Sequence, residues 1–168
     1  MDELLAYRAE LLDRLARQPS ELRAAAALMS EAEWGARRVT DGSTLHQVVA
    51  HVRDVEVLAF LQRIRRILAE DRPTLEFYAT HNWSADRYRP AEPLADILAE
   101  FARAREAGLQ LMRGMAPDDW ARIGFHPPSG WRTAQWWAER MYAHSQEHLA
   151  EIRRAHPQAL SGPGVPDP

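Results

Sequence analysis

Two histidines four residues apart have the spacing in this chain that best suits chemistry. His144 and His148 lie in Glu139-Arg-Met-Tyr-Ala-His-Ser-Gln-Glu-His148, a stretch with helical character. On a helix, side chains at i and i+4 point to the same side, with Cβ atoms about 5–6 Å apart. Two such imidazoles can close on one metal ion, with bonds of about 2.0–2.1 Å to zinc. A third histidine from a facing helix would complete a three-nitrogen site with open coordination positions, which chemistry at a metal requires.

His51 is the candidate for the third ligand. At 100° per residue it belongs to a stripe of a predicted helix made of Thr44, Val48, His51, Val55 and Leu58. An imidazole in the centre of a core-facing stripe is costly unless a partner satisfies it. A hydrogen-bonded core histidine and a metal ligand are both open explanations for each residue alone. A common depth for His51, His144 and His148 favours the metal.

Four residues near the pair are candidates for supporting roles. Trp137 and Met141 share the broad face of His144 and could wall a pocket above a metal, although a bulky apolar stripe is more often core. Glu147 and Glu151 could hold the imidazoles by hydrogen bonds or act as a base. The alternative for both glutamates is a solvated face paired with arginines of the same helix.

The remaining histidines are expected to take no part in a metal site. His46 is about 140° round the helix from His51 and is expected at the rim. His81 falls in a long connection, His126 in a proline-rich loop, and His156 after the last turn of a helix, where a cation suits the helix dipole.

Four long helical patterns would position these residues. They cover about residues 2–28, 44–70, 93–115 and 134–155. Thr44-Leu-His-Gln47 has the spacing of a capping box, and Thr133 is the expected N-cap of the fourth helix. Pro19 is expected to kink or interrupt the first helix. No stretch shows convincing strand alternation, so the predicted class is all-α.

The connection over about residues 71–92 decides the predicted topology. Extended at about 3.3 Å per residue, it could span about 65 Å, whereas a helix of about 26 residues is only about 39 Å long. The chain can therefore return along the whole bundle. This predicts an up-down-down-up four-helix bundle with a long crossover between helices two and three, and places His51 and His148 at one depth. We expect one domain, residues 1–157, and a flexible tail, residues 158–168.

Composition excludes several classes of function. The 168 residues are 46% apolar and 27% charged, as in a globular domain. There is no cysteine and no lysine, which excludes disulfides, thiolate ligands, a cysteine nucleophile and Schiff-base chemistry. The net charge is −3 without a basic stripe, which argues against nucleic-acid binding. No apolar run approaches the ~18–20 residues of a membrane span, and the acidic start is unlike a signal peptide, so we expect a cytoplasmic protein with no membrane partner.

The motifs quoted above resemble the DinB/YfiT-like family of metal-binding four-helix-bundle proteins. The resemblance covers most of the chain. It is strongest over residues 45–56, where a histidine is followed by Asp and Glu, and over residues 124–152, which contain His-x-x-x-His at 144–148. It implies metal-ligand status for His51, His144 and His148, an up-down-down-up bundle and a homodimer.

Two residues depart from the family pattern. Ser43 stands where relatives often have tryptophan before helix two, and Ser145 stands where many carry aspartate after the first histidine of the pair. Neither change removes a ligand, but both could alter the pocket or the groups that support the ligands.

The resemblance leaves the function open among three hypotheses. The first is a metal-dependent S-transferase that joins a low-molecular-weight thiol, such as bacillithiol, mycothiol or glutathione, to a small electrophile. The missing cysteine agrees with it, because the nucleophile must then come from the thiol cofactor. The second is a metal-dependent hydrolase that uses metal-bound water, and the third is a non-catalytic metal-binding dimeric stress protein. Three imidazoles suit zinc, nickel, copper or iron, and among these we expect zinc or nickel.

Overall fold

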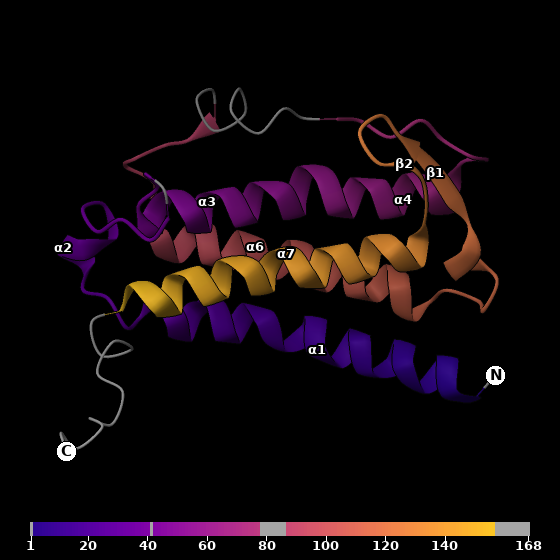
Figure 1. Ribbon diagram of the computed structural model, residues 1–168, viewed down its shortest axis with the longest axis horizontal. Helices are drawn as coiled ribbons and strands as arrows, with labels where there is room; N and C mark the ends of the chain where they lie inside the picture. The colour runs from indigo at the N-terminus through magenta and orange to yellow at the C-terminus, as the bar shows by residue number, and fades with distance from the viewer. Residues whose placement is uncertain (1, 41, 78–86, 157–168) are drawn as a thin grey trace, which may run out of the picture.

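Four long helices build the described part of the molecule. A computed structural model describes residues 2–40, 42–77 and 87–156; the predicted tail and His81 lie outside them. The helices are α1 (Asp2–Ala26), the continuous α3 (Leu45–Val55), η1 (Glu56–Phe60) and α4 (Leu61–Ala69), then α6 (Leu94–Arg113) and α7 (Ala134–Ala155). The short elements are α2 (Glu31–Trp34), η2 (Asp119–Ala121), β1 (Ile123–His126) and β2 (Gly130–Thr133). The predicted helical bundle is confirmed (Figure 1).

Local side-chain chemistry fixes where two of the helices begin. Thr44 caps α3 by accepting a hydrogen bond from the Gln47 backbone N–H, and the Gln47 side chain accepts from the Thr44 N–H at 2.8 Å. Thr133 caps α7 by accepting from the Trp136 N–H at 3.1 Å. Both predicted caps are confirmed. Pro19 lies inside α1 without ending it, so of the two predicted effects the interruption is wrong, and the kink stays a prediction.

Two apolar clusters show how the helices are paired. One cluster joins early α1 with α4, late α6 and early α7, and it includes Leu15, Ile64, Met112 and Trp137. The other joins late α1 with early α3, early α6 and late α7, and it includes Leu22, Leu45, Ile97 and Ile152. Helices α1 and α7 therefore run in one direction and α3–α4 and α6 in the other (Figure 1). Burial of each such side chain contributes about 1.5–3 kcal/mol to folding.

A π-helical turn changes which side chains of the second helix face the core. The segment η1 accommodates an extra residue in its turn, so the faces beyond it are rotated relative to those of α3. Leu58, expected on the core stripe, is only half-buried, whereas Phe60 is 3% exposed. The predicted stripe therefore holds through Val55 and fails beyond it, because regular α-helical spacing does not continue through the π turn.

A short hairpin closes one end of the bundle. Strands β1 and β2 pair antiparallel along their whole length. The backbone N–H of Leu75 donates to Phe125 O at 2.7 Å, and that of Phe125 donates to Pro73 O at 2.8 Å, so the hairpin is joined to the chain that leaves α4. The all-α class holds for the bundle, but sequence analysis missed this hairpin. Four-residue strands are too short for alternation to be recognised.

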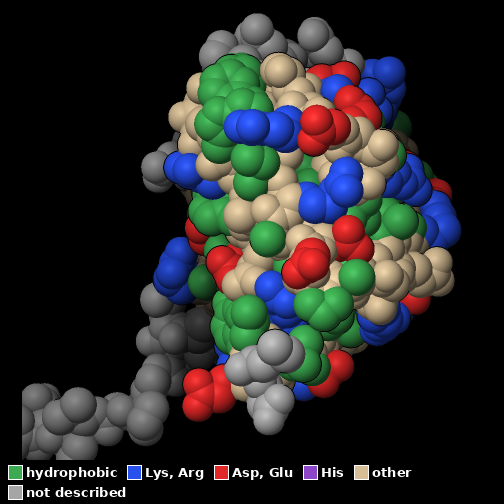
Figure 2. Space-filling model, turned by 90° about the vertical axis from the view of Figure 1, so that its right-hand side faces the viewer, with side chains coloured by type: hydrophobic (Ala, Val, Ile, Leu, Met, Phe, Trp, Pro, Cys, Tyr) green, Lys and Arg blue, Asp and Glu red, His purple; other side chains and the backbone are tan. Residues whose placement is uncertain are grey.

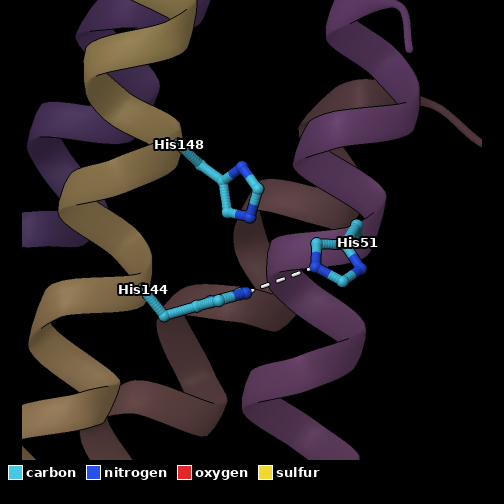
Figure 3. A group of neighbouring side chains, drawn as sticks. All are labelled: His51, His144 and His148. Carbon is cyan, nitrogen blue, oxygen red and sulfur yellow. Dashed lines mark hydrogen bonds between the residues drawn. The ribbon is translucent and has the colours of Figure 1, made fainter. Parts of the chain in front are cut away.

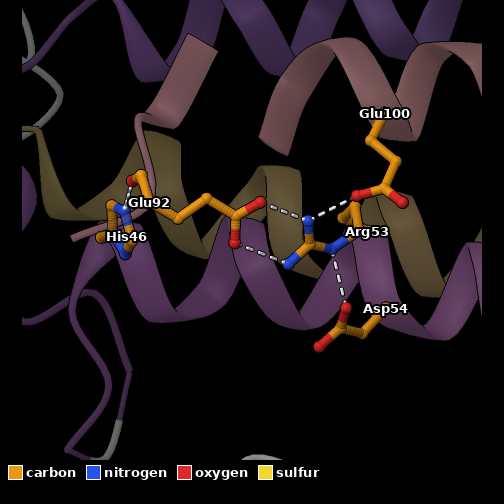
Figure 4. A network of polar contacts seen from close by, with 5 residues as sticks. All are labelled: His46, Arg53, Asp54, Glu92 and Glu100. Carbon is orange, nitrogen blue, oxygen red and sulfur yellow. Dashed lines mark hydrogen bonds and ion pairs between the residues drawn. The ribbon is translucent and has the colours of Figure 1, made fainter. Parts of the chain in front are cut away.

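A charged network fixes the end of the crossover against α3 (Figure 4). Arg53 is buried and donates to both carboxylate oxygens of Glu92, at 2.7 and 3.0 Å. It also donates to Glu100 at 2.6 Å and to Asp54 at 2.7 Å. Charge-assisted bonds of this kind are roughly twice as strong as neutral ones. They hold α3, the crossover end and α6 together on the side of α3 that carries Arg53.

His46 belongs to the same region and corrects one expectation. Its Nε2 donates to the backbone oxygen of Glu92 at 2.7 Å, and its Nδ1 lies 2.9 Å from the Tyr88 hydroxyl. The side chain is buried rather than at the rim. The helix alone would leave this face open, but the returning crossover covers it.

The molecular surface shows no single-sign region at the end that carries the hairpin. In Figure 2, arginine and acidic side chains are interspersed there with apolar side chains. None of the helices in the described part of the chain is both long and apolar enough to cross a membrane.

Candidate metal centre

Three imidazoles meet between α3 and α7. His51 projects from α3, and His144 and His148 project toward it from successive turns of α7 (Figure 3). One ring nitrogen from each residue lies within 4.8 Å of the others. The ring centroids are 5.2 Å apart for His51–His144, 5.2 Å for His51–His148 and 4.7 Å for His144–His148. The structure therefore brings together all three residues that the sequence selected.

The nitrogen separation between His51 and His144 fits one divalent ion. The Nε2 atoms of His51 and His144 are 3.2 Å apart. Two nitrogens bound tetrahedrally at about 2.0–2.1 Å from a common zinc ion are about 3.3–3.4 Å apart. The donor set and this separation thus suit a metal such as zinc, and a nitrogen of His148 lies within 4.8 Å of both. At this distance the two nitrogens can also share a proton, which is the hydrogen-bonded alternative.

Burial keeps two of the rings neutral. It is the main cause that lowers the pKa of His51 to about 4, and the nearby His148 adds to the effect. The pKa of His144 is lowered well below its ordinary value by burial first, then by the charges that His148 and His51 would carry. At pH 7 both rings are therefore uncharged. Neutral imidazole is the form whose lone pair binds a metal.

The two candidate glutamates have different partners. Glu151 accepts a 2.6 Å hydrogen bond from Nδ1 of His148. This bond fixes the tautomer, so the lone pair of His148 is on Nε2, as in the carboxylate–histidine pairs that orient metal ligands. Glu147 instead accepts from Arg140 at 2.8 Å on an exposed face. The structure places Glu151 beside a ligand candidate and Glu147 in the solvated pairing.

The apolar floor of the site differs from the expected pocket wall. Trp137 and Met141 are fully buried members of the core. The aromatic ring against His144 is Phe60, with centroids 5.5 Å apart, and Phe60 in turn contacts Trp137 at 6.4 Å. Sequence analysis missed Phe60 because the π turn brings it to this face.

Arg105 is a second residue that sequence analysis missed. It is 0% exposed on α6 and contacts Ser145, which follows His144. A signal was present, because Phe101, Arg105 and Leu109 follow one another at four-residue spacing on a core-facing stripe. A charged residue within such a stripe indicates a buried partner.

The other described histidines stay apart from the three. His126 ends β1, where its Nε2 accepts from Arg63 at 3.2 Å and its Nδ1 lies 3.0 Å from the Ser129 hydroxyl. Its ring is buried against Trp137 rather than free in a loop. Burial first, and then Arg63, lowers the pKa of His126 to about 4. His156 is the C-cap of α7, as its position in the sequence indicated.

Known proteins similar to this chain indicate its family. The sequence profile described as the DinB superfamily matches residues 14–152, which contain all three histidines. A protein from Bacillus pumilus named "Putative metal-dependent hydrolase" is 28% identical over 142 residues, 84% of this chain and 80% of that protein. A protein from Bacillus licheniformis with the same description is 28% identical over 142 residues, 83% of this chain and 79% of that protein.

One solved structure has the same fold. YfiT from Bacillus subtilis is described as "a probable metal-dependent hydrolase with an unusual four-helix bundle topology". It superposes with a TM-score of 0.80 over 88% of this chain and 85% of its own, at 21% sequence identity. Because the family profile spans most of the chain and includes its three-histidine cluster, this protein belongs to the DinB superfamily.

Proposed function

We propose that this protein is a divalent-metal-dependent enzyme whose ion is held by His51, His144 and His148. The observation that carries the proposal is the 3.2 Å separation of two Nε2 atoms within a cluster of three imidazoles from two helices. The names of the two Bacillus relatives support metal dependence. We expect zinc or nickel, since imidazole ligands suit both.

The protein's own residues prepare the site for a small ligand. Glu151 holds the ring of His148, and Phe60 covers the inner side of His144 with an apolar surface. A divalent ion bound by three neutral ligands keeps its full charge and open positions, so it lowers the pKa of a ligand bound there. His51 and His148 are each partly exposed, and in this proposal the small molecule binds on that side of the ion.

A low-molecular-weight thiol is the nucleophile that we propose first. The chain has no cysteine, so a thiol must come from a cofactor. Glu151, the carboxylate beside the cluster, already accepts a hydrogen bond from Nδ1 of His148, so in this proposal it orients a ligand and does not act as the base that water would need. A thiol has a pKa of about 8.5 and bulk water one of about 15.7, so a thiol needs far less help to lose its proton. In the proposed reaction the thiol loses its proton to solvent, its sulfur bonds to an electrophilic carbon, and the bond from that carbon to the leaving group breaks, with the electron pair departing on the leaving group.

Hydrolysis is the alternative, and the names of the relatives favour it. A three-imidazole site can also activate water, as zinc does in other enzymes. The two functions differ in the nucleophile, so they can be separated by the substrate that is consumed.

The first experiment tests the metal site. Purified protein is loaded with zinc, nickel or cobalt, and bound metal is measured after gel filtration. We expect one ion per chain and a sharp loss of metal in His51→Ala. His156→Ala is the matched control, since His156 lies at the end of α7 away from the cluster. Full metal content in His51→Ala would refute the site.

The second experiment tests the nucleophile. Cobalt-loaded protein is mixed with bacillithiol, mycothiol or glutathione and a model electrophile. Thiol transfer predicts a sulfur-to-cobalt charge-transfer band and faster conjugation, both lost in His148→Ala. If none of these thiols produces the charge-transfer band or faster conjugation, thiol transfer is refuted. Ester turnover by the same metal-loaded protein would then favour the hydrolase. Absence of both thiol transfer and ester turnover would favour a non-catalytic metal-binding protein.

A further inference from the structure

Arg105 is a buried arginine whose five N–H groups all have acceptors. Its Nε and Nη2 donate to the two carboxylate oxygens of Glu56 at 2.6 and 3.0 Å, and Nη2 also donates to the Ser145 hydroxyl at 3.0 Å. Its Nη1 donates to the backbone oxygen of Leu15 at 3.1 Å and to the side-chain oxygen of Gln18. A guanidinium has five donors, so every one is satisfied. Arg105 thereby joins α6 to α1, η1 and α7.

Pro19 explains why α1 can accept from this arginine. Proline has no backbone N–H, so the carbonyl four residues earlier, that of Leu15, has no helical donor. Arg105 supplies a donor instead. The next acceptor, Gln18, is also tied to the last helix, because its side-chain N–H donates to the backbone oxygen of Tyr142 at 2.9 Å. The carbonyl that Pro19 leaves without a helical donor thus receives its hydrogen bond from a side chain on α6.

The network lies against both helices that carry the histidines. Ser145 directly follows His144 on α7, and successive residues on a helix point about 100° apart. His144 can therefore face α3 while its neighbour bonds Arg105. On the other side Glu56 begins η1, the turn that ends with Phe60, whose ring lies 5.5 Å from that of His144.

A metal site of this kind requires accurate spacing between α3 and α7. Metal–nitrogen distances are held within about 0.2 Å of their ideal values. Since the nitrogens come from two helices, a small sliding or rotation of α7 would change the 3.2 Å separation of His51 and His144. The apolar contacts around the site are not directional, whereas the hydrogen bonds of Arg105 are.

We propose that Arg105 is a positioning residue for the three-histidine site. By tying Ser145 on α7 to Glu56 in η1, it sets how far apart the two helices hold their imidazoles. This inference rests on the proposed metal site, but not on which reaction the metal supports.

The test must separate positioning from stability, and a double substitution does so. Glu56→Leu combined with Arg105→Met replaces the ion pair with apolar side chains and so leaves no buried charge without its partner. Cobalt is titrated into wild type and variants at 25 °C, and its affinity and visible spectrum are recorded beside the thermal midpoint. We expect the double variant to stay folded and to bind cobalt about tenfold more weakly, with an altered spectrum. Ser145→Ala should weaken binding in the same direction by a smaller factor.

Met112→Ala is the matched control. Met112 is buried on the same helix but belongs to the apolar cluster, so its loss should lower the thermal midpoint and leave cobalt affinity unchanged. Wild-type affinity and spectrum in the folded double variant would overturn the proposal, as would equal weakening in Met112→Ala. If the double variant does not fold, unchanged cobalt binding in Ser145→Ala overturns it. Failure of the wild type to bind cobalt would instead refute the metal site itself.

Discussion

Glu151 provides a sharp test of how the site is held. Its carboxylate is 2.6 Å from Nδ1 of His148, and the two side chains are 28% and 18% exposed. Removing a carboxylate that orients a metal-bound imidazole costs about 10–100-fold in metal affinity. Because both groups are partly open to solvent, we expect the lower end, about tenfold or about 1.4 kcal/mol, for Glu151→Ala.

The assay is a zinc titration in competition with a chromophoric chelator at pH 7. Glu147→Ala is the matched control, because Glu147 lies on the same helix and bonds Arg140 on the exposed face. We expect its zinc affinity to equal that of the wild type. The zinc affinity of Glu151→Gln should lie between those of Glu151→Ala and the wild type, since an amide oxygen can still accept from Nδ1 but carries no charge. Equal zinc affinity in Glu151→Ala and Glu147→Ala would refute the orienting role of Glu151.

Two further predictions concern stability. After chelation of the metal, the far-UV circular dichroism should stay helical and the thermal midpoint should fall without loss of cooperative unfolding, because the two apolar clusters supply the core without an ion. A random-coil spectrum after chelation would instead show that the metal is structural. In metal-free protein, the pKa of His126 is about 4 in the folded state and about 6.5 in the unfolded state. The unfolded state therefore binds the proton first, so the contribution of His126 to the free energy of unfolding is present above pH 6.5 and is lost as the pH falls toward 4. Urea unfolding at pH 7 and 4.5 should therefore show a smaller loss of free energy in His126→Gln than in the wild type, and equal losses would contradict this assignment.

The sequence by itself determined the helices and the ligand candidates. Thr44 and Thr133 mark helix starts through hydrogen bonds to residues only three positions away, so their caps could be predicted. His144 and His148 share a face because helical geometry alone puts residues i and i+4 together. Even the inward direction of His51 followed from a periodic stripe, since it lies before the π turn. All of these depend on local interactions that sequence spacing encodes.

Only the tertiary structure decided which polar groups support the site. Glu147 and Glu151 were equivalent candidates in the sequence, and the contact of Glu151 with His148 distinguishes them. The hairpin β1–β2 and the burial of His46 likewise depend on segments that return from far along the chain.

The same holds for Phe60 and Arg105. The π turn rotates the following faces of its helix, so regular α-helical spacing could not place Phe60 beside His144. The acceptors of Arg105 come from three other helical segments, including Glu56 in η1 and the carbonyl of Leu15 that Pro19 leaves without a helical donor. Sequence periodicity shows which way a side chain points from its own helix. The partner it meets depends on how the helices pack, because sub-ångström translations and small rotations between distant segments decide whether a hydrogen bond or a metal site forms.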